Sequence, residues 1–140
     1  MPKFRLNKNV YEEAVSRTKF AFDSFEKVYL SFSAGKDSTV MLHIAMDEAK
    51  KRNKRIGILI VDLEGQYKLT IDHIYECVKE YKDFIDLYWV CLPLHLRNAV
   101  SVYEPFWKCW DKDKKEDWIR DLPKESISDE DYFPFFRNGM

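Results

Sequence analysis

Cysteine and glycine are scarce in this sequence, and it contains no long apolar run. Its three cysteines, Cys77, Cys91 and Cys109, are an odd number and include no closely spaced C-x-x-C pair. This usage fits a reducing cytoplasm better than a disulfide framework. The first residues hold no apolar signal core, and no segment approaches the length of a membrane span. We therefore expect a cytoplasmic protein without a membrane partner.

A large excess of one charge sign is also missing. The formal net charge is −1, which argues against direct electrostatic capture of nucleic acid. The charges are nevertheless uneven, because residues 1–55 carry twelve Lys and Arg against seven Asp and Glu, whereas residues 111–131 carry five against nine. The basic amino-terminal half suits an anionic ligand, although scattered solvated charges would give the same counts.

The 140 residues, of which 46% are hydrophobic, fit one domain over residues 1–140. Apolar spacings of three and four predict helices, and short apolar runs predict buried strands. The helices are expected over residues 11–25, 38–52 and 68–81, and the strands over 27–31, 56–61 and 85–91. This alternation predicts an α/β fold: an open parallel, Rossmann-like sheet with right-handed crossovers and helices on both faces.

The regular pattern ends at Pro93, and the aromatic-rich segment from about 93 to 140 is expected to be irregular. Residues 117–122 predict a short helix, and Ser126 or Ser128 could cap another turn. Three strands make a thin sheet. We expect either the last segment, another subunit or further chain to complete it.

The segment Leu30-Ser31-Phe32-Ser33-Ala34-Gly35-Lys36-Asp37-Ser38 lies between the first strand and the next helix. Ligands of open parallel sheets bind beyond the carboxyl ends of the strands, and a helix amino terminus offers unpaired N–H groups to an anion. Gly35 permits a tight turn and close backbone approach, while Lys36 supplies a point charge for phosphate. Asp37 is expected to cap the helix or to help place a magnesium ion.

Two common phosphate-binding motifs do not fit this loop. The P-loop requires glycine at position 30 and serine or threonine at position 37, where this sequence has leucine and aspartate. The dinucleotide pattern G-x-G-x-x-G fails because Gly35 is the only glycine in the loop. A phosphate on this loop is therefore expected to bind in a geometry that differs from both the P-loop and the dinucleotide turn.

Residues 33–38, Ser-Ala-Gly-Lys-Asp-Ser, resemble the Ser-Gly-Gly-x-Asp-Ser pyrophosphate loop of the adenine nucleotide α-hydrolase superfamily, except for alanine at Ala34. The preceding Leu-Ser-Phe-Ser is typical of its phosphoadenosine phosphosulfate (PAPS) reductase branch. Residues 61–67, Val-Asp-Leu-Glu-Gly-Gln-Tyr, resemble the Asp-Thr-Gly-x-x-aromatic turn of that branch. Residues 88–94 and 104–110 are similar to a subgroup that includes the immunoglobulin-binding regulator A co-activators, which are paired with ParB-like partners.

The resemblance implies an adenine nucleotide ligand, ATP or PAPS, with magnesium as a possible companion. The nucleotide-binding residues that it implies are Ser31, Phe32, Ser33, Ala34, Gly35, Lys36, Asp37, Ser38, Asp62 and Glu64, with Lys36 and Asp37 as catalytic candidates. Asp37 and Asp62 are the candidate magnesium ligands. His95 and Arg97 are candidate anion contacts, because they follow the third strand.

Reductase chemistry is not expected of this chain alone. The resembled reductases use a cysteine in a Glu-Cys-Gly segment, which this sequence lacks, and three separated cysteines fall short of a four-thiolate iron–sulfur cluster. The cysteines are therefore interpreted as small buried residues. The three histidines have no mutual metal-ligand spacing, so zinc is not expected, and the aromatic stretch around Trp107 is interpreted as core or subunit interface.

Two functional hypotheses follow. The first is an enzyme-like site that cleaves between the α- and β-phosphates and adenylates an acceptor, with Lys36 neutralising the developing charge. The second is a catalytically silent regulatory module that works as a homo-oligomer or with a ParB-like or DNA-associated partner. The missing catalytic cysteine and the Ala34 departure favour the second hypothesis.

Overall fold

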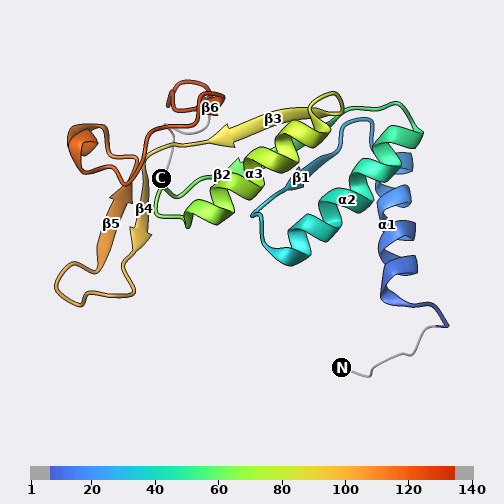
Figure 1. The fold of residues 1–140 in the computed structure, drawn as a ribbon, viewed down its shortest axis with the longest axis horizontal. Helices are drawn as coiled ribbons and strands as arrows, with labels where there is room; N and C mark the ends of the chain where they lie inside the picture. Colours follow the sequence, from blue (N-terminus) through green and yellow to red (C-terminus); the bar gives the residue numbers. More distant parts are fainter. Residues whose placement is uncertain (1–6, 135–140) are drawn as a thin grey trace.

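The computed structural model describes residues 7–134. The chain folds into alternating helices and strands, followed by a hairpin and short elements (Figure 1). The alternating part comprises α1 (Val10–Ser24), β1 (Tyr29–Ser31), α2 (Lys36–Lys51), β2 (Ile56–Val61), α3 (Lys68–Tyr81) and β3 (Ile85–Val90). The rest comprises β4 (Leu94–Arg97), β5 (Phe106–Cys109), the 3₁₀ helix η1 (Lys112–Asp117) and β6 (Ser126–Ile127).

The first six elements confirm the sequence prediction, with small shifts at their ends. The bounds of β2 and α3 agree with the expected residues, and α2 begins two residues earlier than expected, at Lys36. Helix α1 begins with a capping box, in which the Asn9 side chain accepts from the Glu12 N–H and the Glu12 carboxylate accepts from the Asn9 N–H. Such caps satisfy N–H groups that have no acceptor inside the helix.

A parallel sheet in the order β1-β2-β3-β6 forms the centre of the fold. The register pairs Leu30 with Ile58 and Ile58 with Leu87, so the carboxyl ends of β1, β2 and β3 lie at one common edge of the sheet. Strand β6 adds only Ser126 and Ile127, which pair with Trp89 and Val90. The α/β fold with an open parallel sheet is thereby confirmed, and a strand from the last segment extends the sheet.

The helices gather over one face of this sheet (Figure 1). Ile56, Ile58 and Ile60 alternate along β2 and are buried together with residues of α2 and α3, while α1 packs against α2. Strands β1, β2 and β3 lie side by side in chain order, so two crossovers of the same hand must return on the same side of the sheet. That topology explains why the helices form one layer, whereas the sequence pattern predicted helices on both faces of the sheet.

The opposite face of the sheet is open to solvent in the described chain. Tyr29 is 70% exposed there, and Val61 and Tyr88 are also exposed. Gly57 lies between two of these side chains, and a Cβ at its position would come within 3.1 Å of the Tyr29 Cβ. Glycine at this point leaves room for the close approach of Tyr29 on the neighbouring strand.

The segment after Pro93 is more regular than the sequence indicated. Strands β4 and β5 form an antiparallel hairpin that projects beyond the carboxyl end of β3 (Figure 1). The short helix expected over residues 117–122 is wrong, because the 3₁₀ helix η1 ends at Asp117 and residues 118–122 are not helical. Ser126 belongs to a strand rather than to a helix cap. None of the helices within residues 7–134 is long and apolar enough to cross a bilayer.

Candidate functional site

The loop after β1 begins with a buried anchor. Phe32 is 2% exposed, and its N–H donates to the Leu59 carbonyl at 2.8 Å, which continues the pairing of β1 with β2. The chain then leaves the sheet, and Ser33 and Gly35 are exposed before α2 starts at Lys36. The expected phosphate-binding segment therefore lies where the resemblance requires it, at the carboxyl edge of the sheet.

Hydroxyl groups brace the turn around the carbonyl of Gly35. This oxygen accepts from the Ser38 hydroxyl at 3.0 Å, from the Thr39 hydroxyl at 2.9 Å and from the Thr39 N–H at 2.9 Å. The Ser33 and Ser38 hydroxyl oxygens lie 3.1 Å apart. The N–H groups of Lys36, Asp37 and Ser38 precede the first helical hydrogen bond, so the helix itself supplies them with no acceptor.

The residue of the loop with an unfavourable backbone conformation is Ala34 rather than Gly35. Ala34 has φ of 59°, in the left-handed region, whereas Gly35 has φ of −74°, which any residue can adopt. A Cβ at Gly35 would meet the Ser33 Oγ at 3.5 Å, an ordinary contact. The turn conformation at Gly35 therefore does not require glycine, and the expected close approach of a ligand to this residue stays a prediction. The alanine that departs from the resembled motif keeps the backbone shape that glycine would adopt more easily.

Lys36 and Asp37 project into solvent from the first turn of α2. Their side chains are 92% and 93% exposed, and the Lys36 Nζ lies 3.8 Å from the Asp37 Oδ1. Gly35 is the N-cap of α2, and no side chain makes a capping hydrogen bond there. Asp37 therefore does not cap the helix as expected, and both charged groups are free to turn toward a ligand.

Asp62, at the end of β2, is buried inside a hydrogen-bond network. Only 1% of its surface is exposed, and one carboxylate oxygen accepts from the Trp89 indole N–H at 2.8 Å. The other oxygen accepts from the Glu64 N–H at 2.9 Å and from the Arg120 guanidinium. The structure thus engages the whole Asp62 carboxylate within the chain.

Glu64 joins the same edge of the sheet to the carboxy-terminal segment. Its backbone has φ of 65°, and its carboxylate accepts from the Trp110 N–H at 2.6 Å and from the Ile119 N–H at 3.2 Å. The Arg120 Nε–H donates to the Glu64 carbonyl at 3.2 Å. Sequence reasoning missed Arg120. It could have been anticipated, because a carboxylate such as Asp62 that is buried at the end of a strand requires a cationic partner.

His95 and Arg97 lie on β4, within the hairpin rather than in a loop. His95 lines a cleft of about 550 Å³ together with Glu64, Lys108 and Trp118. No residue of the segment 31–38 lines this cleft. The structure therefore brings Glu64 and His95 together in this cleft. The candidate phosphate-binding residues 31–38 lie elsewhere along the same edge of the sheet.

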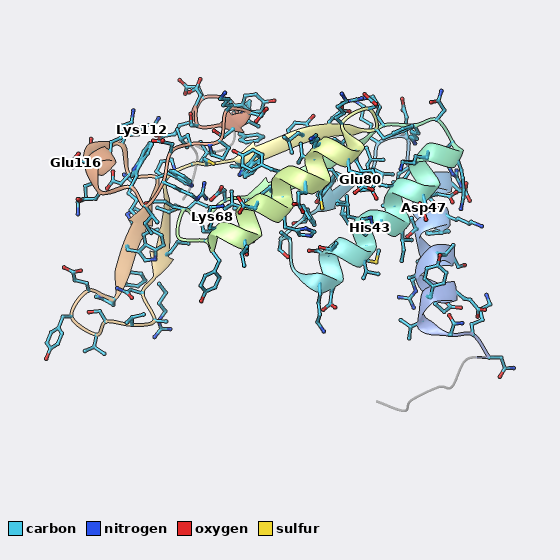
Figure 2. The ribbon with its side chains drawn as sticks, in the orientation of Figure 1. His43, Asp47, Lys68, Glu80, Lys112 and Glu116 are labelled. Atoms are coloured by element: carbon cyan, nitrogen blue, oxygen red, sulfur yellow. The ribbon has the colours of Figure 1, made fainter. Side chains whose placement is uncertain are left out.

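Helix α3 contributes a residue that the sequence did not single out for this site. His73 Nε2 lies 3.0 Å from the Thr39 Oγ1, and its ring lies against Phe32 with centroids 6.3 Å apart. His43, farther along α2, makes a 2.5 Å contact from its Nδ1 to the Tyr81 hydroxyl (Figure 2). Both histidines are hydrogen-bonded, as expected, and only His73 touches the loop.

The three cysteines are buried, which confirms their interpretation as small core residues. Burial raises the pKa of the Cys91 thiol, and it also raises the pKa of Cys77 and of Cys109. Thiols in this state carry little thiolate at neutral pH and react slowly. Within residues 7–134, no group of three or more His, Cys, Asp or Glu side chains is arranged to hold a metal ion.

Comparison with known proteins points to one family. Residues 27–124 match the phosphoadenosine phosphosulfate reductase domain. The chain is 38% identical over 139 residues to the uncharacterized protein YbdN of Escherichia coli (strain K12). This alignment covers 99% of the chain and 34% of YbdN, so the chain spans about a third of that relative. No solved structure matches the chain.

Proposed function

Because the chain belongs to the phosphoadenosine phosphosulfate reductase domain family, we propose that it binds an adenine nucleotide, ATP or PAPS, with the phosphates on Ser33–Ser38. The observation that carries the proposal is the exposed amino terminus of α2, where the Lys36 ammonium group, 92% exposed and 3.8 Å from Asp37 Oδ1, can reach a ligand beside N–H groups that have no acceptor inside the helix. The site lies at the carboxyl edge of a parallel sheet, where such folds bind ligands.

The loop offers a set of donors that suits a pyrophosphate group. The N–H groups at the start of α2 and the Ser33 hydroxyl would each bind a different phosphate oxygen, and the exposed Lys36 ammonium would add a positive charge. The bracing of Gly35 by Ser38 and Thr39 means that little backbone ordering is left for the binding step. Asp37 is the exposed carboxylate that would share a magnesium ion with the phosphates.

The reaction that fits such a site is substitution at the α-phosphorus. With ATP, an acceptor oxygen or nitrogen forms a bond to this phosphorus and gives up its proton to solvent. The bond to the bridging α–β oxygen breaks, and pyrophosphate leaves with the electron pair. Lys36 would neutralise the charge that develops on the leaving group. Thiol-dependent sulfate reduction is not proposed, because the three cysteines are buried and burial raises the pKa of each.

Calorimetric titration with ATP and with PAPS, each with and without magnesium, tests the proposal. Lys36→Ala is expected to weaken binding about tenfold, because a hydrogen bond from a charged donor to phosphate is lost. Lys68→Ala is the matched control, since Lys68 is the first residue of α3 at the same sheet edge (Figure 2) and its ammonium group is paired with Asp72 at 2.5 Å. Equal affinities for the parent and Lys36→Ala would contradict the proposal.

A further inference from the structure

One side chain contacts both ends of the proposed phosphate-binding loop. Phe32 immediately precedes Ser33, and Thr39 immediately follows Ser38. The His73 ring lies against Phe32, with a centroid separation of 6.3 Å, and its Nε2 lies 3.0 Å from the Thr39 Oγ1. His73 is half-buried and comes from a different helix, α3. The loop is thus held at both ends by a residue far from it in the chain.

The direction of the hydrogen bonds follows from the chemistry of the partners. The Thr39 Oγ1 lies 2.9 Å from the Gly35 carbonyl oxygen, which can only accept, so the Thr39 hydroxyl proton points there. In the arrangement that uses both contacts, Thr39 Oγ1 accepts from His73 and the imidazole proton is on Nε2, whose other close neighbour is the Cys77 Sγ at 3.7 Å. A chain of two hydrogen bonds therefore runs from His73 through Thr39 to the Gly35 carbonyl.

These two hydrogen bonds affect the ligand-facing side of the loop through the peptide group between Gly35 and Lys36. The Gly35 carbonyl and the Lys36 N–H belong to the same planar peptide group and point in opposite directions. The Gly35 carbonyl also accepts from the Thr39 N–H and from the Ser38 hydroxyl, so the hydrogen bond from the Thr39 hydroxyl adds to the bonds that hold the Lys36 N–H outward, toward the anion. Phe32, held by the same imidazole, fixes the other end of the loop.

From this arrangement, we infer that His73 is a positioning residue for nucleotide binding. It supports the orientation of the Gly35–Lys36 peptide through Thr39 and does not itself contact the phosphates. The inference rests on the proposed function and goes beyond it, because it assigns a role in ligand binding to a residue of α3 outside the phosphate-binding motif.

A general contact between two helices would not have this effect, and the protein contains a comparison. His43 and Tyr81 join the same two helices farther from the loop, with a distance of 2.5 Å between Nδ1 and the hydroxyl (Figure 2). Neither residue contacts residues 32–39 in the hydrogen bonds and ring contacts of the described chain. Removing this pair should loosen the helix contact without turning the Gly35–Lys36 peptide.

The test is calorimetric titration of the full chain with ATP and PAPS, using four variants beside the parent. His73→Leu removes the donor and keeps the bulk, whereas His73→Gln keeps an N–H near the position of Nε2. His43→Leu is the helix-contact control, and Lys36→Ala reports on the loop itself. Thermal unfolding of each variant shows whether it folds.

We expect His73→Leu to weaken nucleotide binding about tenfold, equivalent to the loss of one well-placed hydrogen bond. His73→Gln should bind within about threefold of the parent, and His43→Leu should bind as the parent does. If His73→Leu does not fold, Thr39→Val and Thr39→Ser replace it, since serine keeps the hydroxyl and valine removes it. Thr39→Val should then bind about tenfold more weakly than Thr39→Ser.

Two kinds of failure are distinguishable. Parent-like affinity in His73→Leu, or an equal loss in His43→Leu, overturns the positioning role while a loss in Lys36→Ala leaves the proposed function standing. An equal loss in His73→Leu and His73→Gln also overturns it, because the donor at Nε2 would not be the cause. No effect of Lys36→Ala removes the proposed function, and the role of His73 with it.

Discussion

Ala34 and Glu64 occupy matching positions at the carboxyl edge of the sheet. Each is the third residue after its strand, each immediately precedes a glycine, and each has a positive φ, 59° for Ala34 and 65° for Glu64. The resembled motifs have glycine at both positions, where it adopts this conformation without a Cβ penalty. The chain thus places residues with a Cβ in two left-handed positions, where they are strained.

Replacing Ala34 by glycine should stabilise the protein. The left-handed conformation costs a residue with a Cβ about 1–2 kcal/mol, and glycine loses about 0.5–1 kcal/mol more conformational entropy on folding. The free energy of unfolding should therefore rise by about 0.5–1 kcal/mol in Ala34→Gly, as measured by urea denaturation. Ala14→Gly, within α1, is the control and should lower it by about 1 kcal/mol. A lower stability in Ala34→Gly would contradict the strain.

The pairing of Asp62 with Arg120 gives a second prediction. Asp62→Asn leaves the guanidinium group of Arg120, which is 20% exposed, without its counter-charge. Unfolding in urea should show a loss of about 2–4 kcal/mol. Arg120→Met in the Asp62→Asn background should recover part of this loss, because it removes the unpaired charge. Additive losses in the double-mutant cycle would show that the two groups do not interact.

Stability should fall as the pH rises above the ordinary thiol pKa. Burial raises the pKa of Cys91 from its ordinary value of 9.0, and it raises the pKa of Cys77 and Cys109 in the same direction. The folded protein keeps protons that the unfolded chain releases, so this stability is complete below about pH 9 and declines above it. The decline should approach about 1.4 kcal/mol per pH unit for each thiol.

Urea denaturation at several values between pH 7 and pH 10 measures this decline. In Cys91→Ala, the free energy of unfolding should decline less steeply above pH 9, because one thiol fewer contributes to the decline. The stability at pH 7 should fall because a small cavity forms. An unchanged slope in Cys91→Ala would mean that Cys91 is not protonated in the folded state as its burial requires.

The sequence predicted the elements whose signals are local. Helix α3 and strand β2 have apolar spacings that identify them without tertiary information, and the structure has both at the expected residues. The hairpin β4–β5 was missed because its pairing joins residues such as Leu94 and Cys109, which lie far apart in the chain. The single helical layer was missed for a similar reason, since strand order is set by packing and not by any one segment.

The site shows the same division. Residue types and spacing placed the loop of residues 33–38 at the sheet edge, and the exposed Lys36 fits the expected role. The burial of Asp62 and Glu64 depends on Trp110 and Arg120, which reach them from the carboxy-terminal segment. No local pattern reports such a contact. Their expected part in nucleotide or magnesium binding stays a prediction, beside the structural role that the contacts give them.

Gly35 offers the clearest separation of folding from binding. With φ of −74° and an ordinary 3.5 Å contact for an added Cβ, Gly35→Ala should change the stability by less than about 1 kcal/mol, because the lower entropy of the unfolded chain offsets the poorer helix capping by alanine. The same methyl group would lie beside the N–H groups proposed to hold phosphate, so ATP affinity should fall about tenfold. Gly57→Ala is the opposite control: its Cβ would lie 3.1 Å from the Tyr29 Cβ in the sheet, far from the loop. That variant should lose stability and keep the nucleotide affinity of its folded fraction. If Gly35→Ala binds nucleotide as the parent does, the phosphates do not approach this backbone, and the ligand must lie elsewhere along the sheet edge.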